Sequence, residues 1–216
     1  LEQQPAQPLS VKPIISSTYK GQPVILSPDI LQQFNSWFDD AKQKDAVYCN
    51  GMSVATVDEH GQPSSRIVLL KSVDEEGFTF FTNYNSRKGD DIAHNSKVAA
   101  TFWWSAFQRQ IRIEGVVTKT TRQESTEYFS QRPLLSQVAA AISDQSQPVA
   151  SFDALQTQFD EGKARLGDDV SCPDYWGGYR IDAHHIEFWQ GKDHRLHERQ
   201  LFEVKDGEWV LSILQP

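Results

Sequence analysis

The stretch VAATFWWSAFQRQIRIEGVV, residues 98–117, decides the fold class of this chain. Its second half alternates, with Ile111 and Ile113 on one face and Arg112 and Glu114 on the other, as in a strand buried on one side. Its first half is rich in aromatic residues, which favour strands. Because the two runs are close in sequence, they are expected to pair as antiparallel neighbours.

The same pattern continues on both sides of this stretch. Further strands are predicted at residues 52–57, 66–71, 78–82, 178–181, 185–189, 200–204 and 209–213, with turns at 58–63, 74–77 and Gly207. Helices are predicted at 27–44, 90–94, 122–129 and 152–164. We therefore expect a mainly β, antiparallel barrel with helices, as a single domain over residues 27–216, preceded by an extended arm at 1–26.

Composition excludes several functional classes. The 216 residues hold 21 Lys and Arg against 29 Asp and Glu, a net charge of -8, which argues against nucleic acid as a partner. The longest apolar run, 138–142, is far shorter than the roughly 20 residues that span a membrane. Two cysteines and no visible secretory signal indicate a cytoplasmic protein. The first residue is not Met, which leaves an upstream segment open.

The charge is unevenly distributed, and the middle of the chain carries candidate anion sites. Residues 66–132 hold ten Lys and Arg against eight Asp and Glu. Ser86, Arg87 and Lys88 precede a helical run, and a helix N-terminus with two cations favours a phosphate group. Arg66 and Lys71 flank an apolar strand. The alternative interpretation is ordinary helix capping at Ser86 and charged strand ends at Arg66 and Lys71.

A second candidate anion site lies further along. Tyr128, Arg132 and Ser136 offer a phenol, a guanidinium and a hydroxyl within nine residues, and Pro133 would break a helix between them. They could converge on one oxyanion, or they could simply cap helix ends. The polar loop 144–147 follows, and it can donate and accept hydrogen bonds without indicating a particular ligand.

The C-terminal part contains the densest cluster of functional side chains. Glycines in Trp-Gly-Gly-Tyr-Arg, residues 176–180, allow a close approach of backbone or ligand, or a tight bend beside a core Trp. Residues 194–199 read His-Arg-Leu-His-Glu-Arg, which suits an anionic or electron-rich ligand better than a metal, because arginines interleave with the imidazoles. A solvated charged turn is the alternative. Serine-hydrolase, Walker and Rossmann fingerprints are absent from the sequence.

Taken in order, these segments resemble the pyridoxine (pyridoxamine) 5′-phosphate oxidase family. The resemblance runs from about Tyr19 to Pro216, through residues 65–71, 86–88, 108–110, 128–129, 132–133, 136–137, 145–146, 176–180, 186–191 and 195–197. It implies a Greek-key split β-barrel that forms a homodimer, with FMN in the subunit interface.

The resemblance also implies roles for particular residues. The FMN-binding residues would be Arg66, Ile67, Val68, Leu69, Leu70, Lys71, Phe81, Thr82, Arg87, Lys88, Gln110, Gln145, Ser146, Trp189 and Arg199. The substrate phosphate would be bound by Lys71, Tyr128, Arg132 and Ser136. Arg195 and His197, with Leu196 between them, would contact the pyridine ring as the catalytic pair. No metal is implied.

The implied reaction oxidises pyridoxine or pyridoxamine 5′-phosphate to pyridoxal 5′-phosphate by hydride transfer from C4′ to flavin N5. Dioxygen is the acceptor, hydrogen peroxide is released, and the amine also yields ammonia. One alternative is a related oxidase of another aromatic metabolite, such as a phenazine precursor, which residues 195–199 and the terminal Leu-Gln-Pro also resemble. Another is a flavin-binding protein without catalysis.

Three positions depart from the family pattern. Glu198 replaces the usual Asp, Ala141 replaces a Trp, and Ser16 stands where an Arg usually precedes Tyr19. The last change affects the expected arm, so the sequence leaves open whether that arm covers the site.

Overall fold

The structure, a computed structural model, describes residues 24–44 and 47–216. Most of the expected arm, with Ser16 and Tyr19, lies outside these residues. The elements are α1 (Pro28–Lys44), β1 (Gly51–Val57), β2 (Pro63–Leu69), β3 (Ser72–Asp74), β4 (Gly77–Asn83), α2 (Arg87–His94), β5 (Lys97–Trp104), η1 (Ser105–Phe107), β6 (Arg109–Lys119), α3 (Arg122–Ser130), α4 (Leu134–Ile142), α5 (Phe152–Leu166), β7 (Trp176–Gln190), η2 (Asp193–Arg195), β8 (Glu198–Lys205) and β9 (Glu208–Ile213).

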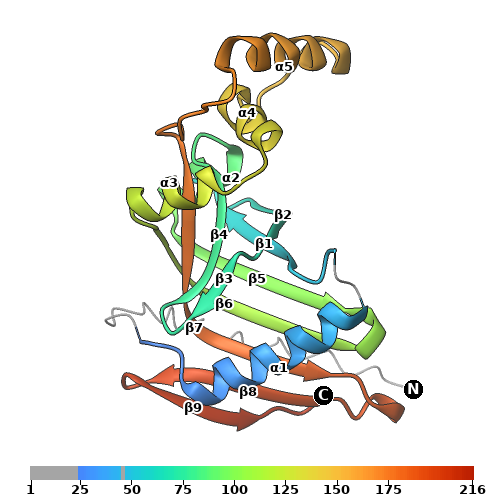
Figure 1. Cartoon of the computed structure of the whole chain (residues 1–216). Coiled ribbons are helices and arrows are strands. Elements are labelled where there is room, and N and C mark those ends of the chain that lie inside the picture. The colour runs from blue at the N-terminus through green and yellow to red at the C-terminus, as the bar shows by residue number, and fades with distance from the viewer. Residues whose placement is uncertain (1–23, 45–46) are drawn as a thin grey trace, which may run out of the picture.

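The strands of this part of the chain form one curled antiparallel sheet, as the sequence predicts (Figure 1). Its main path is β2-β1-β5-β6-β7-β4-β3, and the β8–β9 hairpin branches from β7. The long strand β7 pairs with β6 on one side, and on the other side it pairs first with β4 and then with β8. One strand therefore joins the two halves of a split barrel.

The main core lies between the inner face of the sheet and α1. Pro28 begins this helix, Asp29 is in its first turn, and Ile30 and Phe34 on its buried face are fully covered. Phe34 packs against Phe78 and Phe102 with edge-to-face geometry at centroid distances of 5.2 and 5.6 Å. Helix α1 thus covers one face of the sheet, as the apolar spacing predicts.

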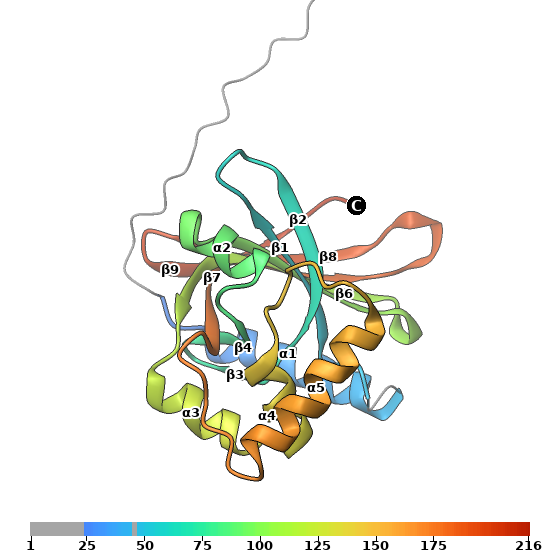
Figure 2. The same cartoon turned by 90° about the horizontal axis from the view of Figure 1, so that it is seen from above.

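A smaller apolar cluster holds α3, α4 and α5 at the opposite end of the sheet from the β8–β9 hairpin (Figures 1 and 2). Phe129, Val138 and Trp176 are buried there. The glycines after Trp176 let side chains pack onto β7, since a Cβ at Gly177 would lie 2.2 Å from the Tyr84 hydroxyl. Glycine at this strand entry therefore serves packing between elements.

The structure corrects two parts of the predicted strand pattern and adds a helix. The strands expected at 178–181 and 185–189 are one strand, β7, because a bulge opposite Glu114 and Gly115 absorbs the break in alternation. The strand expected at 66–71 ends at Leu69, so Lys71 lies in the connection between β2 and β3. Strand β3 itself was not predicted. Helix α4 was also not predicted, although Leu134, Val138 and Ile142 have helical spacing after Pro133.

Within residues 24–44 and 47–216, every helix is too short or too polar to cross a membrane.

Candidate active site

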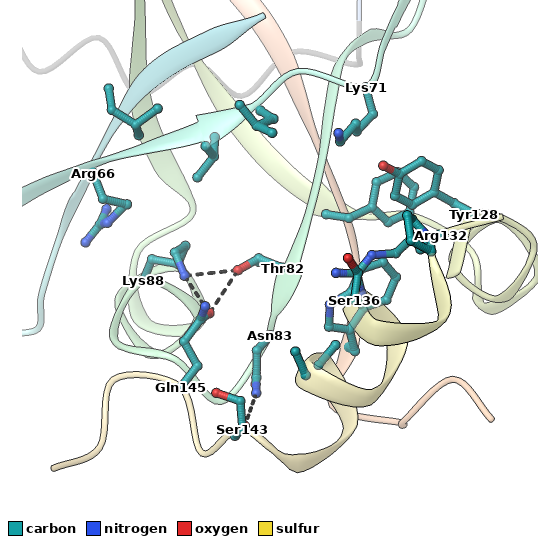
Figure 3. A pocket seen from close by; sticks show the side chains of 18 of the residues that line it. Arg66, Lys71, Thr82, Asn83, Lys88, Tyr128, Arg132, Ser136, Ser143 and Gln145 are labelled. Atoms are coloured by element: carbon teal, nitrogen blue, oxygen red, sulfur yellow. Dashed lines mark hydrogen bonds between the residues drawn. The ribbon is translucent and has the colours of Figure 1, made fainter. Parts of the chain in front are cut away.

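A pocket of about 790 Å³ lies where β2, β4, α2, α3 and α4 meet, within the range of small-molecule sites. Figure 3 shows Arg66, Lys88 and Gln145 at one end and Lys71, Tyr128, Arg132 and Ser136 at the other, with Thr82 between them. The lining residues are Arg66, Ile67, Val68, Leu69, Lys71, Phe81, Thr82, Asn83, Lys88, Tyr128, Gln131, Arg132, Pro133, Ser136, Ala139, Ala140, Ser143, Gln145 and Trp176. Lys88 of the first predicted anion site, together with Arg66, and Tyr128, Arg132 and Ser136 of the second thus line opposite ends of one pocket.

Lys88 is the most deeply buried cation at the first end. It follows Ser86, the N-cap residue of α2, and its Nζ donates to Thr82 Oγ1 at 3.0 Å, Ser86 Oγ at 2.9 Å and Gln145 Oε1 at 2.9 Å. Within the described residues no carboxylate forms an ion pair with it. Burial, and then the charge of Arg66, lower its pKa to about 8. A buried ammonium held only by neutral oxygens is suited to an anionic ligand.

Arg66 lies beside Lys88 and is held in place by polar groups of the sheet. Its Nη1 donates to Thr56 Oγ1 at 2.7 Å, and its Nη2 lies 3.6 Å from Asp91 Oδ2. Burial lowers the pKa of Arg66, and Asp91 opposes that shift. Thr56 in turn donates to the same Asp91 oxygen at 2.5 Å. Thr56 and Asp91 are supporting residues that the sequence analysis missed.

The first turn of α2 and the loop after α4 complete this end of the pocket. The Arg87 N–H donates to Ser146 Oγ at 3.2 Å, so the predicted pair lies together, although both residues are exposed and outside the pocket lining. Asn83 Nδ2 donates to the Ser143 carbonyl at 3.1 Å and ties the loop to β4. Neither Asn83 nor Ser143 was predicted. Their only sequence signal is their position, at the end of β4 and directly after α4.

Arg132 dominates the other end and lacks a partner for one of its nitrogens. Its Nη1 is buried without a hydrogen bond among the described residues. Its guanidinium lies over the Trp176 ring, 4.7 Å from the centroid, and burial lowers its pKa. A buried, unsatisfied donor is costly, and an anion bound in the pocket would satisfy it.

Lys71, Tyr128 and Ser136 surround Arg132 at the same end. Lys71 Nζ is 5.8 Å from the centroid of the Tyr128 ring. That ring stacks on Phe81 at 4.1 Å, and Phe81 stacks on Trp176 at 5.5 Å, so aromatic packing holds the phenol in place. Helix α4, which was not predicted, carries Ser136 into the pocket.

The remaining predicted residues lie elsewhere. Leu70 is buried in the main core. Gln110, Trp189 and Arg199 are register partners across β6, β7 and β8, on the sheet face opposite α1, and we call these three residues the ring row. Trp189 is thirteen residues along β7 from Trp176, roughly 40 Å of strand at about 3.3 Å per residue. Within one protomer the ring row is therefore separate from the pocket.

The predicted catalytic pair lies in the exposed connection between β7 and β8. The ring of His197 packs against that of Trp189 at a tilt of 42°, with 4.6 Å between centroids, and its Nδ1 accepts a hydrogen bond from the Lys192 backbone N–H at 3.2 Å. That contact makes Nδ1 the acceptor and leaves the proton on Nε2. Arg195 has a left-handed φ of 62°, which a non-glycine residue rarely adopts. Glu198, which stands where the family usually has Asp, forms an ion pair with Lys192 at 3.3 Å.

No group of three or more metal-ligating side chains is found in the described ranges. The donor set instead fits a cofactor and a substrate that each carry an anionic group. The buried Lys88 and the half-buried Arg132, whose Nη1 is buried, lie at opposite ends of the pocket, and apolar side chains of β2 line the space between. An elongated or paired ligand with a flat, largely uncharged middle would satisfy both ends.

Solved structures define the class of this fold. PhzG from Burkholderia lata, in complex with tetrahydrophenazine-1-carboxylic acid, is similar with a TM-score of 0.82 and 26% identity, over 90% of this chain and 100% of that one. A pyridoxamine 5′-phosphate oxidase-related, FMN-binding protein from Nostoc punctiforme is similar with a TM-score of 0.73 and 15% identity, over 88% of this chain and 99% of that one. The fold is that of the FMN-binding split barrels.

Sequence comparison defines the family. Residues 39–166 match the model of pyridoxamine 5′-phosphate oxidase, and residues 176–216 match a pyridoxine 5′-phosphate oxidase C-terminal dimerisation region. Pyridoxine/pyridoxamine 5′-phosphate oxidases from Herminiimonas arsenicoxydans and Burkholderia thailandensis are 46% and 48% identical, over 87% and 88% of this chain and 90% and 91% of theirs. The chain belongs to the pyridoxamine 5′-phosphate oxidase family of FMN-dependent oxidoreductases.

Proposed function

We propose that this protein oxidises pyridoxine 5′-phosphate or pyridoxamine 5′-phosphate to pyridoxal 5′-phosphate, with FMN as cofactor and dioxygen as acceptor. The observation that carries this proposal is the unsatisfied Nη1 of Arg132, at the end of the pocket opposite Lys88. One anion-binding end of the pocket can hold the phosphate of FMN. The second site then requires a substrate with an anionic group of its own, as the phosphorylated vitamers have.

Arg66 and Lys88 would hold the FMN phosphate, with Arg87 and Ser146 beside them. The positive end of α2 and two charges favour a dianion at this place. Strand β2 would lie along the flavin through Ile67 and Leu69, which are exposed in the pocket. When bound there, FMN would supply the redox chemistry, as the acceptor of the C4′ hydride and the donor of electrons to dioxygen.

The substrate phosphate would be bound by Lys71, Tyr128, Arg132 and Ser136. Arg132 is already desolvated and stacked on Trp176, so little conformational freedom is lost when it binds an anion. The contact of Lys71 with the Tyr128 ring places an ammonium beside the phenol. These residues orient the vitamer ring toward the middle of the pocket, where the reaction takes place.

A homodimer would bring the ring row and the catalytic pair to the pocket. The matched dimerisation region spans β7 to β9, which carry Trp189, Arg195, His197 and Arg199. Since these residues lie far along β7 from Trp176 in their own protomer, we assign them to the pocket of the partner. Arg195 would then orient the substrate ring, and His197 would donate from Nε2 to its polar groups. A cytoplasmic location completes the proposal.

Anaerobic spectroscopy of the FMN-loaded protein tests the proposed substrate. Pyridoxamine 5′-phosphate should bleach the flavin absorbance, whereas pyridoxamine, which lacks the phosphate, should bleach it far more slowly at equal concentration. Hydrogen peroxide should appear with pyridoxal 5′-phosphate when air is admitted. A flavin that neither phosphorylated vitamer reduces would refute the proposal, and equal rates with pyridoxamine would refute the role of the Arg132 end.

The similarity to PhzG favours one second candidate, an oxidase of a partly reduced phenazine carboxylic acid. A carboxylate could occupy the Arg132 end in place of a phosphate. The same anaerobic assay separates the two candidates, because flavin reduction by tetrahydrophenazine-1-carboxylic acid, and not by the vitamers, would support this one. A flavin reduced by neither class of compound would indicate a binding protein without catalysis.

A further inference from the structure

The most deeply buried carboxylate on the sheet face opposite α1 is Glu187, whose side chain is 1% exposed. It lies on β7 between Arg112 of β6, its register partner, and Arg199 of β8. No role is predicted for this residue from its sequence pattern, and the proposed function uses only its neighbours in the ring row. A buried charge of this kind is expensive unless it is fully hydrogen-bonded.

Both oxygens of Glu187 bind arginine. Arg199 donates from Nε to Oε1 at 2.6 Å and from Nη2 to Oε2 at 3.1 Å, while Arg112 Nη1 donates to Oε2 at 3.0 Å. The pKa of Glu187 is lowered, since the hydrogen bonds and charges of Arg199 and Arg112 outweigh the effect of burial. The contact with Arg199 is bidentate, the geometry that best fixes the plane of a guanidinium.

The contact with Glu187 determines which N–H donors of Arg199 remain available to a ligand. An arginine has five N–H donors; Glu187 takes two of those on Arg199, and the Gln215 carbonyl takes a third, from Nη1 at 3.0 Å. One N–H on each Nη atom is left without a partner in the part of the chain that the structure describes. Glu187 is paired with Arg199, and Arg112 has a second carboxylate partner in Glu114 at 3.4 Å, so these two N–H groups are directional donors rather than a free positive charge.

We infer that Glu187 is a positioning residue for flavin binding, which holds the guanidinium of Arg199 so that its remaining N–H groups bind uncharged acceptors of the flavin ring. This rests on the proposed function, in which Arg199 reaches the partner's pocket, and on the contact with FMN that the family resemblance implies for Arg199. Stability alone is a poor reason for burying this carboxylate, because the desolvation of a buried charge can offset what its ion pairs contribute. A preorganised ring contact explains the retained charge.

Titration of FMN into the apoprotein, followed by quenching of flavin fluorescence, tests the inference through a double-mutant cycle. Arg199→Gln and Glu187→Gln are each expected to weaken FMN binding by about 10- to 100-fold, the range of hydrogen bonds to charged groups. In the double variant, the second substitution should add less than about twofold, because Glu187 acts through Arg199. Arg112→Gln is the matched control and should change FMN affinity by less than about twofold.

Each other outcome of the cycle contradicts a particular statement. Additive losses in the double variant would show that Glu187 acts on structure in general and overturn the inference. An FMN affinity unchanged by Arg199→Gln would overturn both the inference and the assumed contact of Arg199 with FMN. The proposed substrate is tested separately, by the anaerobic assay. A loss of affinity in Arg112→Gln equal to that in Glu187→Gln would also overturn it.

Arg199→Lys keeps the test decisive if Glu187→Gln does not fold. Lysine retains the charge but cannot make the bidentate contact, so FMN affinity should fall about as far as in Arg199→Gln. An affinity within about twofold of the unmodified protein would show that charge alone matters and would overturn the inference.

Discussion

The pocket and the ring row both present cationic side chains to a ligand, but Lys88 and Arg132 of the pocket form no ion pair within the described residues, whereas Arg199 of the ring row is paired with Glu187. Lys88 is held by three neutral oxygens, and Arg132 has a buried nitrogen without a partner in residues 24–44 and 47–216. Arg199, in contrast, is bound bidentately by Glu187. An uncompensated cation attracts an anionic group, whereas a compensated arginine offers directional hydrogen bonds. The two regions thus suit the charged and uncharged parts of ligands.

The largest effect is expected from Lys88→Met, which removes an uncompensated charge while keeping most of the side-chain volume. FMN should bind roughly 100-fold more weakly, at the upper end of the range for charged hydrogen bonds. Fluorescence titration of the apoprotein measures this loss. Lys97→Met, at an exposed position on β5, is the control and should bind FMN normally. Equal FMN affinities in the two variants would contradict the assignment of the FMN phosphate to this end of the pocket.

Arg132→Met tests the other end of the pocket. The KM for pyridoxamine 5′-phosphate should rise by roughly 30-fold, because a charged hydrogen bond to the phosphate is lost, while FMN affinity stays within about twofold. Steady-state peroxide production and FMN titration measure the two quantities. Arg165→Met on the exposed side of α5 should change neither. A loss of FMN with an unchanged KM would show that the assignments of the two ends are reversed.

Riboflavin, which lacks the phosphate of FMN, separates the pocket from the ring row. Arg199→Gln should weaken the binding of riboflavin and FMN by similar factors, about tenfold, because its contacts are with the ring. Lys88→Met should weaken FMN much more than riboflavin. Competition titrations with the two flavins measure these ratios, and a selective loss of FMN in Arg199→Gln would place the phosphate at the ring row.

The smallest expected effect is a dependence of FMN affinity on pH. Lys88 has its pKa lowered to about 8 by burial and by Arg66, and a bound phosphate would raise it again. Binding above pH 8 therefore requires proton uptake, so affinity should fall by about fourfold from pH 7 to pH 8.5. Titrations across this range should show that FMN affinity declines with pH in the unmodified protein and that this pH dependence is absent from Lys88→Met. A constant affinity would contradict the role of a titrating Lys88.

Much of the fold could be predicted because its signals are local. The cap and apolar spacing of α1 lie within one segment, and the alternation around Ile111 and Ile113 identifies a half-buried strand without knowledge of its partners. Strand β7 could not be predicted as one element. Its continuity depends on a bulge opposite residues of β6, which are about seventy positions away in the sequence.

The candidate site shows the same division. The sequence by itself determined which chemical groups are available, because Lys88 after a cap residue and Arg132 after an aromatic helix end are local features. Tertiary structure decided that these two cations line one pocket, that α4 brings Ser136 to it, and that Glu187 pairs with Arg199. The physical reason is that burial and charge pairing depend on contacts between distant segments, which no local pattern specifies.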